Sequence, residues 1–129
     1  MVNIPANLLY SSTHTWVEVL EDDSVRVGVT DFAQQELGEI IFIELPEFER
    51  SYTAGEECAV IESVKTAVDV YCPIGGEIID VNHDLEDNPA LINADPYGDG
   101  WLFQLRPDNT VDIDELVDAE DYAEQIEQE

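Results

Sequence analysis

The chain has 129 residues, of which 31 are acidic and 4 are basic, so its formal net charge is −27. This charge makes nucleic acid and anionic membranes poor partners, because phosphate binding needs the opposite sign. At this length one hydrophobic core fits and two do not, which predicts a single domain over residues 1–129. No run approaches the roughly eighteen apolar residues of a membrane span, and the start lacks the layout of a signal peptide. We therefore expect a cytoplasmic location.

The acidic residues are spread from Glu18 to Glu129 instead of being gathered in one tail. An acidic chain can be disordered, but 44% of these residues are hydrophobic and they fall in regular strand-like runs. We expect a folded domain with an acidic shell, which suits a cytoplasm of high salt where charge repulsion is screened. An unusually acidic protein from an ordinary cytoplasm is the alternative.

The first half of the chain is predicted to form two strands and a short helix. Alternating apolar residues predict strands over residues 16–20 and 25–29. A helix is expected near residues 31–37, with Asp31 as its N-cap and Gly38 closing it. This is predicted to be the only helix before the C-terminus.

The remaining elements outside residues 58–71 are also predicted from their patterns. Residues 39–45 form a near-continuous apolar run, which predicts a central strand. Residues 77–81 and 101–105 are predicted strands, and residues 82–100 between them are predicted to be a loop. Residues 112–128 carry apolar residues at three-to-four spacing behind an acidic start, which predicts a C-terminal helix. A frayed acidic tail is the alternative.

Two runs rich in small and β-branched residues, at 58–61 and 68–71, are predicted to form a hairpin. If Val64 and Lys65 are the two residues of its turn, Ile61 pairs with Val68 on a mostly apolar face and the other face is mixed. Tight turns favour Asn or Gly, so a Val-Lys pair predicts modest backbone strain at the tip.

The segments on the two sides of this hairpin resemble each other. Residues 27–29 and 38–40 are echoed by residues 68–70 and 76–78. A duplicated four-stranded unit would produce this pattern. The sequence therefore predicts a mostly β protein, folded as a flattened barrel or sandwich of two quasi-repeated sheets.

The two cysteines lie at equal distances from Lys65, which invites a disulfide across the hairpin. In the predicted register Cys72 pairs with Glu57, so its side chain points to the face opposite that of Cys58. We expect two free thiols, which is the usual state in a reducing cytosol.

Lys65 is the only lysine in the chain. A composition that keeps this one lysine indicates chemistry that arginine cannot perform. A Schiff-base lysine is desolvated, whereas a hairpin tip beside Glu62 keeps the amine exposed and charged. An exposed amine can instead be acylated by another enzyme and become the root of a cofactor arm. Because no nucleophile signature or calcium loop is present elsewhere, we expect a carrier with no catalytic residue and no metal.

The sequence Glu-Ser-Val-Lys-Thr-Ala at residues 62–67, followed by Asp69, resembles the lipoyl-attachment hairpin of the glycine cleavage system H proteins. The similarity continues in order at residues 14–16, 27–30, 33–34, 37–39, 44–46, 73–77, 91–93 and 96–101. The resemblance implies a lipoyl/biotinyl-carrier-like fold with lipoate attached covalently to Lys65. It also implies that Glu62, Ser63 and Asp69 are functional neighbours of that lysine.

The resemblance implies a set of partners as well. H proteins carry the aminomethyl group of glycine from a pyridoxal-phosphate glycine decarboxylase to an aminomethyltransferase that uses tetrahydrofolate. A dihydrolipoyl dehydrogenase reoxidises the lipoyl arm with NAD, and a lipoate ligase or lipoyltransferase attaches it. By this resemblance the chain is a monomeric carrier and not itself an enzyme.

Two positions depart from the family pattern. Thr15 stands where the family often has Glu, and Phe32 stands where it often has His. In the family these polar residues help to line a cleft that shelters the aminomethyl-loaded arm. Asp69 is then the remaining candidate anion for the charged cargo.

Other carrier and non-carrier functions remain as alternatives. Lipoyl domains of 2-oxoacid dehydrogenases usually have Asp-Lys-Ala and biotin carriers usually have methionines beside the lysine, neither of which matches residues 64–66. A lipoyl relay that donates the group to other 2-oxoacid dehydrogenase complexes uses the same lysine. An unmodified acidic interaction module is the alternative from a different class.

We predict that the melting temperature rises with potassium chloride well beyond the physiological range. With 31 acidic and 4 basic side chains, most of the repulsion in the folded state is unbalanced. The Debye length falls from about 10 Å at 0.1 M salt to about 3 Å at 1 M, so screening should saturate near molar salt. Thermal melts from dilute to several molar salt test this. A melting temperature that stays flat or falls would mean that the acidity is not a salt adaptation.

Overall fold

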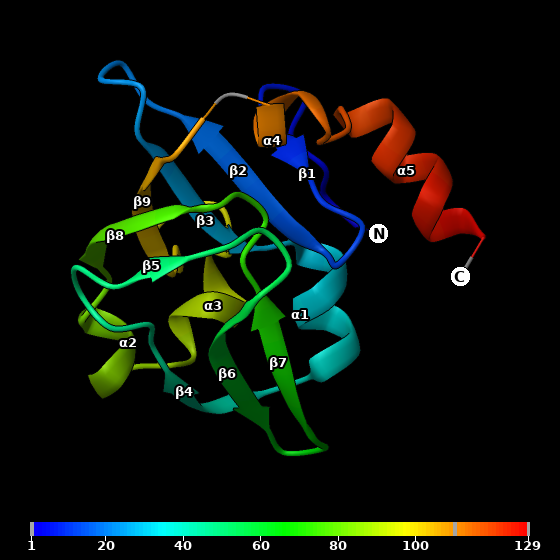
Figure 1. The fold of residues 1–129 in the computed structure, drawn as a ribbon. Helices are drawn as coiled ribbons and strands as arrows, with labels where there is room; N and C mark the ends of the chain where they lie inside the picture. The colour runs from blue at the N-terminus through cyan, green and yellow to red at the C-terminus, as the bar shows by residue number, and fades with distance from the viewer. Residues whose placement is uncertain (1, 110, 129) are drawn as a thin grey trace.

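The computed structural model describes residues 2–109 and 111–128 of the chain (Figure 1). The single-domain prediction also covers residues 1, 110 and 129, which lie outside the described residues. The elements in chain order are β1 (Leu9–Tyr10), β2 (Thr15–Val19), β3 (Val25–Val29), α1 (Asp31–Leu37), β4 (Ile40–Glu44), β5 (Ser51–Tyr52), β6 (Glu57–Ser63), β7 (Ala67–Tyr71), β8 (Gly76–Val81), α2 (Asp84–Asp87), α3 (Leu91–Ala94), β9 (Phe103–Pro107), α4 (Val111–Asp114) and α5 (Ala119–Glu127).

The strands form two antiparallel sheets, which confirms the predicted mostly β fold class. One sheet has six strands in the order β1-β2-β3-β9-β8-β5, and the other has three in the order β4-β6-β7. Their inner faces share one apolar core that includes Val27, Ile61, Ile78 and Phe103. Period-two alternation places these side chains inside, because successive residues of a strand point to opposite faces.

A second, smaller core attaches the C-terminal helix to the six-stranded sheet. Tyr10 of β1 and Tyr122 of α5 stack with ring centroids 4.8 Å apart, and both rings are fully buried together with Trp16. The Trp16 indole N–H donates to the Pro96 carbonyl at 2.9 Å. The α5 helix therefore lies beside β1 (Figure 1). No helix of the described residues is long and apolar enough to cross a membrane.

The predicted C-terminal helix is confirmed as α5, but it is shorter than residues 112–128, because α4 and an extended stretch at Val117 precede it. Val117 exchanges two backbone hydrogen bonds with Tyr10, at 2.8 and 2.9 Å, so it extends the sheet as an isolated bridge. Asp118 then starts α5 by accepting a hydrogen bond from the Asp121 N–H. The long-range pairing with β1 outweighs the local helical pattern.

The prediction of a helix-free loop over residues 82–100 is also wrong, since the segment contains α2 and α3. The Asn82 side chain donates to the carbonyls of Asp99 and Trp101, which joins the two ends of the segment. Each short helix buries one apolar residue, Leu85 in α2 and Ile92 in α3. Burial of single side chains in one-turn helices leaves no periodic pattern to detect.

The α1 helix spans the predicted residues, but its N-cap is Thr30 and not Asp31. The Thr30 hydroxyl accepts from the Ala33 N–H at 3.2 Å. Asp31 is the first helical residue, where its carboxylate accepts from the side chains of Gln34 and Gln35. Gly38 ends the helix at φ 78°, a conformation that favours glycine.

The strand predicted to be central, β4, lies at the edge of the three-stranded sheet. Its pairing with β6 shifts by one residue between Ile40 and Phe42. This β-bulge leaves Ile41 and Phe42 exposed side by side, while Ile40 and Ile43 are buried. The run of apolar residues at 39–45 therefore includes side chains that are exposed to solvent, and it does not mark a strand that is buried on both faces.

The prediction that the cysteines point to opposite faces is wrong. A second shift in register, between Glu57 and Ala59, pairs Glu57 with Tyr71 instead of Cys72. Both cysteines are free and buried in the main core. Their thiols donate to different carbonyls, Cys58 to Val70 and Cys72 to Ile74. The pKa of the Cys58 thiol is raised far above its usual range. The larger cause is a hydrogen bond with Cys72, and the second cause is burial.

We predict that iodoacetamide labels Cys58 and Cys72 of the native chain slowly and labels both rapidly in denaturant without a reducing agent. Buried thiols react only when the core opens. A Ser51→Cys variant provides an exposed cysteine on β5 as a positive control. Rapid labelling of the native pair, or a pair that stays unlabelled after unfolding, would show that the two thiols are not buried and free.

Candidate functional site

The β6–β7 hairpin has the register that the sequence predicted near its tip. Ile61 pairs with Val68 and Glu62 with Ala67, and the Ser63 N–H donates to the Thr66 carbonyl at 2.8 Å. Val64 and Lys65 are therefore the two turn residues. Lys65 is exposed. The tip of the β6–β7 hairpin extends beyond the other strands (Figure 1).

The tip is held by side-chain hydrogen bonds and shows no positive φ. The buried Ser63 hydroxyl accepts from the N–H groups of Lys65 and Thr66, at 3.1 and 3.3 Å. The non-glycine residues with positive φ in the described part of the chain are His14, Asp23 and Glu49, all outside the tip. The predicted backbone strain is absent from the tip, where the Ser63 side chain accepts from two N–H groups of the turn and no residue needs a positive φ.

The tip also contacts the corner between α1 and β4. The Val64 N–H donates to the Glu39 carbonyl at 3.0 Å. A Cβ atom built on Gly38 would lie 3.4 Å from Lys65 Cε and 3.9 Å from its Nζ. The lysine side chain therefore lies over Gly38, at the end of α1.

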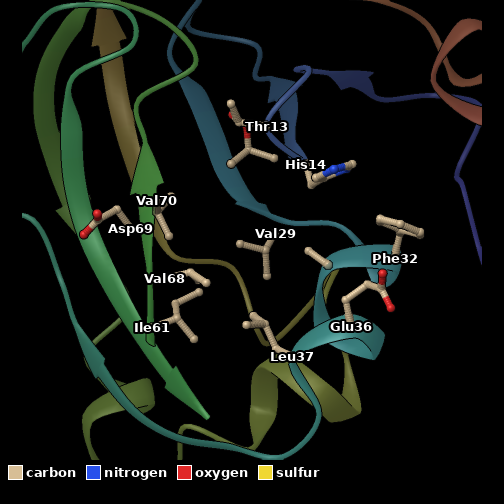
Figure 2. Close-up of a pocket in the computed structure, with 12 residues that line it drawn as sticks. Thr13, His14, Val29, Phe32, Glu36, Leu37, Ile61, Val68, Asp69 and Val70 are labelled. Atoms are coloured by element: carbon tan, nitrogen blue, oxygen red, sulfur yellow. The ribbon is translucent and has the colours of Figure 1, made fainter. Parts of the chain in front are cut away.

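A cleft of about 310 Å³ lies beside the hairpin. In Figure 2, Phe32, Glu36 and Leu37 of α1 form one wall, and Ile61, Val68 and Val70 of the hairpin form the other. The lining is completed by Thr13, His14, Thr15, Val29, Ala33 and Asp69. Gly38 and Phe32 are six residues apart along α1, which corresponds to about 9 Å of helix at a rise of 1.5 Å per residue. The cleft is thus within reach of a long acyl chain attached to Lys65.

The polar groups at the inner end of the cleft already have partners. The Thr15 hydroxyl lies 2.6 Å from Ser11 Oγ. His14 Nδ1 lies 2.8 Å from the Tyr122 hydroxyl, which also lies 2.7 Å from the Thr30 hydroxyl. These contacts link the cleft to the buried aromatic core. They leave a cleft wall that is mainly apolar where the resemblance implied polar residues.

The structure brings together some of the predicted site residues and separates others. Ser63 lies directly beneath Lys65, whereas Glu62 is exposed on the outer face opposite Ala67. Asp69 borders the cleft, but its carboxylate points away from Val29 and Leu37 in Figure 2.

Sequence reasoning missed Glu36, the second carboxylate of the lining. It lies one helical turn after Phe32, so the two share a face once the helix is placed. It also missed the role of Asn93, whose side chain bonds Gly38, Ile40 and Gln34 around the same corner. The available signal in the sequence was the one polar residue, Asn93, within the otherwise apolar segment 91–94.

The described residues contain no group of three or more His, Cys, Asp or Glu side chains that could hold a metal ion. What the site presents is an exposed amine on a rigid hairpin, next to an apolar cleft of suitable length. This arrangement defines a carrier domain, in which a covalently attached cofactor can move between solvent and a sheltered position.

Comparison with known proteins identifies the family. Residues 8–129 match the family model described as glycine cleavage H-protein. The chain is 51% identical over 129 residues to the glycine cleavage system H protein of Pseudoalteromonas atlantica, with all of both chains covered. It is 48% identical over 126 residues to that of Alkalilimnicola ehrlichii, covering 98% of this chain and 97% of the other. The chain belongs to the glycine cleavage H-protein family.

A solved structure supports the same assignment. The crystal structure of a glycine cleavage system H protein from Mycobacterium marinum superimposes with a TM-score of 0.89 at 39% identity. The match covers 96% of this chain and 99% of that chain. The family resemblance and the carrier-like fold expected from the sequence are both confirmed.

We predict that Ser63→Ala lowers the free energy of unfolding by about 1 kcal/mol and slows acylation of Lys65. The substitution leaves two N–H groups of the turn without their acceptor, and a typical hydrogen bond contributes roughly that amount. Urea unfolding and a time course of acylation measure the two effects. Thr66→Ala is the matched control, because the Thr66 hydroxyl makes only a 3.5 Å contact with the Ala67 carbonyl. Equal behaviour of the two variants would contradict the role assigned to Ser63.

Proposed function

We propose that Lys65 carries a covalent lipoyl group and that the chain transports the aminomethyl group of glycine on this arm. The observation that supports the proposal most directly is the position of the single lysine. It lies exposed at the tip of the hairpin, between the matching residues Glu62-Ser63-Val64 and Thr66-Ala67. Family membership supports the same function.

The residues present fit a lipoyl group. Lys65 offers an exposed amine for amide formation, and its side chain lies over Gly38. Lipoate supplies a disulfide that can accept the cargo and can be reoxidised afterwards. Ile61, Val68 and Leu37 form apolar cleft walls that exclude water. Glu36 and Asp69 are the acidic residues of the lining, and the Asp69 carboxylate points away from Val29 and Leu37 (Figure 2).

The proposed partners follow from this function. They are a pyridoxal-phosphate glycine decarboxylase, a tetrahydrofolate-dependent aminomethyltransferase, a dihydrolipoyl dehydrogenase and a lipoate ligase or lipoyltransferase. In the proposal the chain is a cytoplasmic monomer that catalyses no step, because its own residues position the arm while the partner enzymes perform the chemistry. The charge of −27 favours partners whose docking surfaces are basic.

We predict that Lys65→Arg abolishes acylation and carrier activity while leaving the melting temperature within about 2 °C of the wild type, as for an exposed substitution. Arginine keeps the charge but does not form the amide. Intact mass after incubation with a lipoate ligase and lipoate measures the modification. Arg106→Lys is the control, because it adds a second exposed lysine outside the hairpin and should still give one acylation, at Lys65. A lipoylated Lys65→Arg chain would require the proposal to be abandoned.

A further inference from the structure

The β4 strand exposes two neighbouring apolar side chains. Ile41 and Phe42 are 51% and 50% exposed, although a regular strand that buries Ile40 would also bury Phe42 two residues later. The bulge between Ile40 and Phe42 reverses the alternation, and Ile43 is buried again. Bulges commonly re-aim side chains next to functional sites. Here the bulge adds an exposed aromatic ring to the edge of the sheet.

The bulge lies close to the turn that carries Lys65. Ile40 pairs with Ser63 and Phe42 pairs with Glu62, so the bulge is level with the base of the Lys65 turn. Val64, which precedes Lys65, is 62% exposed, and its N–H bonds the β4 corner at Glu39. We call Ile41, Phe42 and Val64 the tip patch. It lies where any enzyme that reaches the Lys65 amine must come close.

Charge indicates what kind of surface covers the tip patch. Glu39, Glu44 and Glu62 are exposed beside it, and the whole chain carries −27. A second copy of the chain would bring the same charge to the contact, which is unfavourable. A surface with an apolar centre and a rim of lysine and arginine is complementary to both the patch and its acidic border.

We propose that the tip patch is the docking surface for the enzyme that acylates Lys65, which contacts it through an apolar surface rimmed by basic residues. This proposal rests on the proposed function. Apolar contact has a specific advantage for so acidic a chain. In molar salt the Debye length is about 3 Å, so charge steering is largely screened, whereas burial of apolar surface keeps its strength.

The test is the kinetics of lipoylation by a lipoate ligase from the same host, with the full chain as the substrate, in 0.1 M and 1 M potassium chloride. The variants are Ile41→Ser with Phe42→Ser, Glu39→Gln at the acidic border, and Val19→Ser. Val19 is 48% exposed on β2 and serves as the matched apolar control. Thermal melts establish that each variant is folded.

The double variant is expected to raise KM about tenfold at both salt concentrations, equivalent to about 1.4 kcal/mol, with kcat nearly unchanged. Glu39→Gln is expected to raise KM in 0.1 M salt only, and Val19→Ser to leave it unchanged.

Unchanged KM in the folded double variant would overturn the proposal. A wild-type dimer that the double variant dissolves, seen by sedimentation, would overturn it in favour of a second copy. If the ligase does not acylate the wild-type chain at Lys65, the proposed function is wrong and this inference loses its basis. Acylation of the wild type with equal KM in all variants would overturn the docking surface alone.

Discussion

The side-chain amide of Asn93 holds the corner on which the candidate site depends. Its Nδ2 donates to the Gly38 carbonyl at 2.8 Å and to Gln34 Oε1 at 2.9 Å, while its Oδ1 accepts from the Ile40 N–H at 2.9 Å. One side chain thereby satisfies the end of α1 and the start of β4, whose backbone groups would otherwise lose their partners. The Lys65 turn bonds the same corner through Glu39. Helix, strand and hairpin tip therefore keep fixed relative positions, which gives a mobile acyl arm a rigid base.

Local patterns predicted the parts of the fold in which neighbouring residues determine the geometry. The hairpin register near Lys65 follows from regular pairing of residues 59–62 with 67–70 about a two-residue turn, and α1 follows from its apolar face and the closing Gly38. Alternation fails where a bulge inserts one residue, because every side chain beyond it changes face. The bulges at residues 41 and 58 caused the incorrect predictions for β4 and for the two cysteines. Neither bulge contains a glycine that would have marked it.

Long-range contacts account for most of the remaining differences. The C-terminal helix is interrupted because Val117 pairs with Tyr10, more than a hundred residues earlier in the chain. In the site, Lys65 and Ser63 were identifiable from the sequence because they are adjacent along it. The cleft was expected only through the family resemblance, at Thr15 and Phe32, since its walls come from α1, the hairpin and the β2–β3 region and meet only in the folded chain. Thr30 and Asp31 are both good N-caps, so local chemistry did not distinguish them.

The account depends most on Lys65 being the root of a lipoyl arm. The most direct measurement is the intact mass of the protein purified from its native host, followed by mapping of the peptide that contains residue 65. We expect a single lipoyl-sized increment located on Lys65 in a substantial fraction of the molecules. The complete absence of the lipoyl increment under conditions of active glycine cleavage, a biotinyl increment, or a lipoyl group on any other site would contradict the central claim.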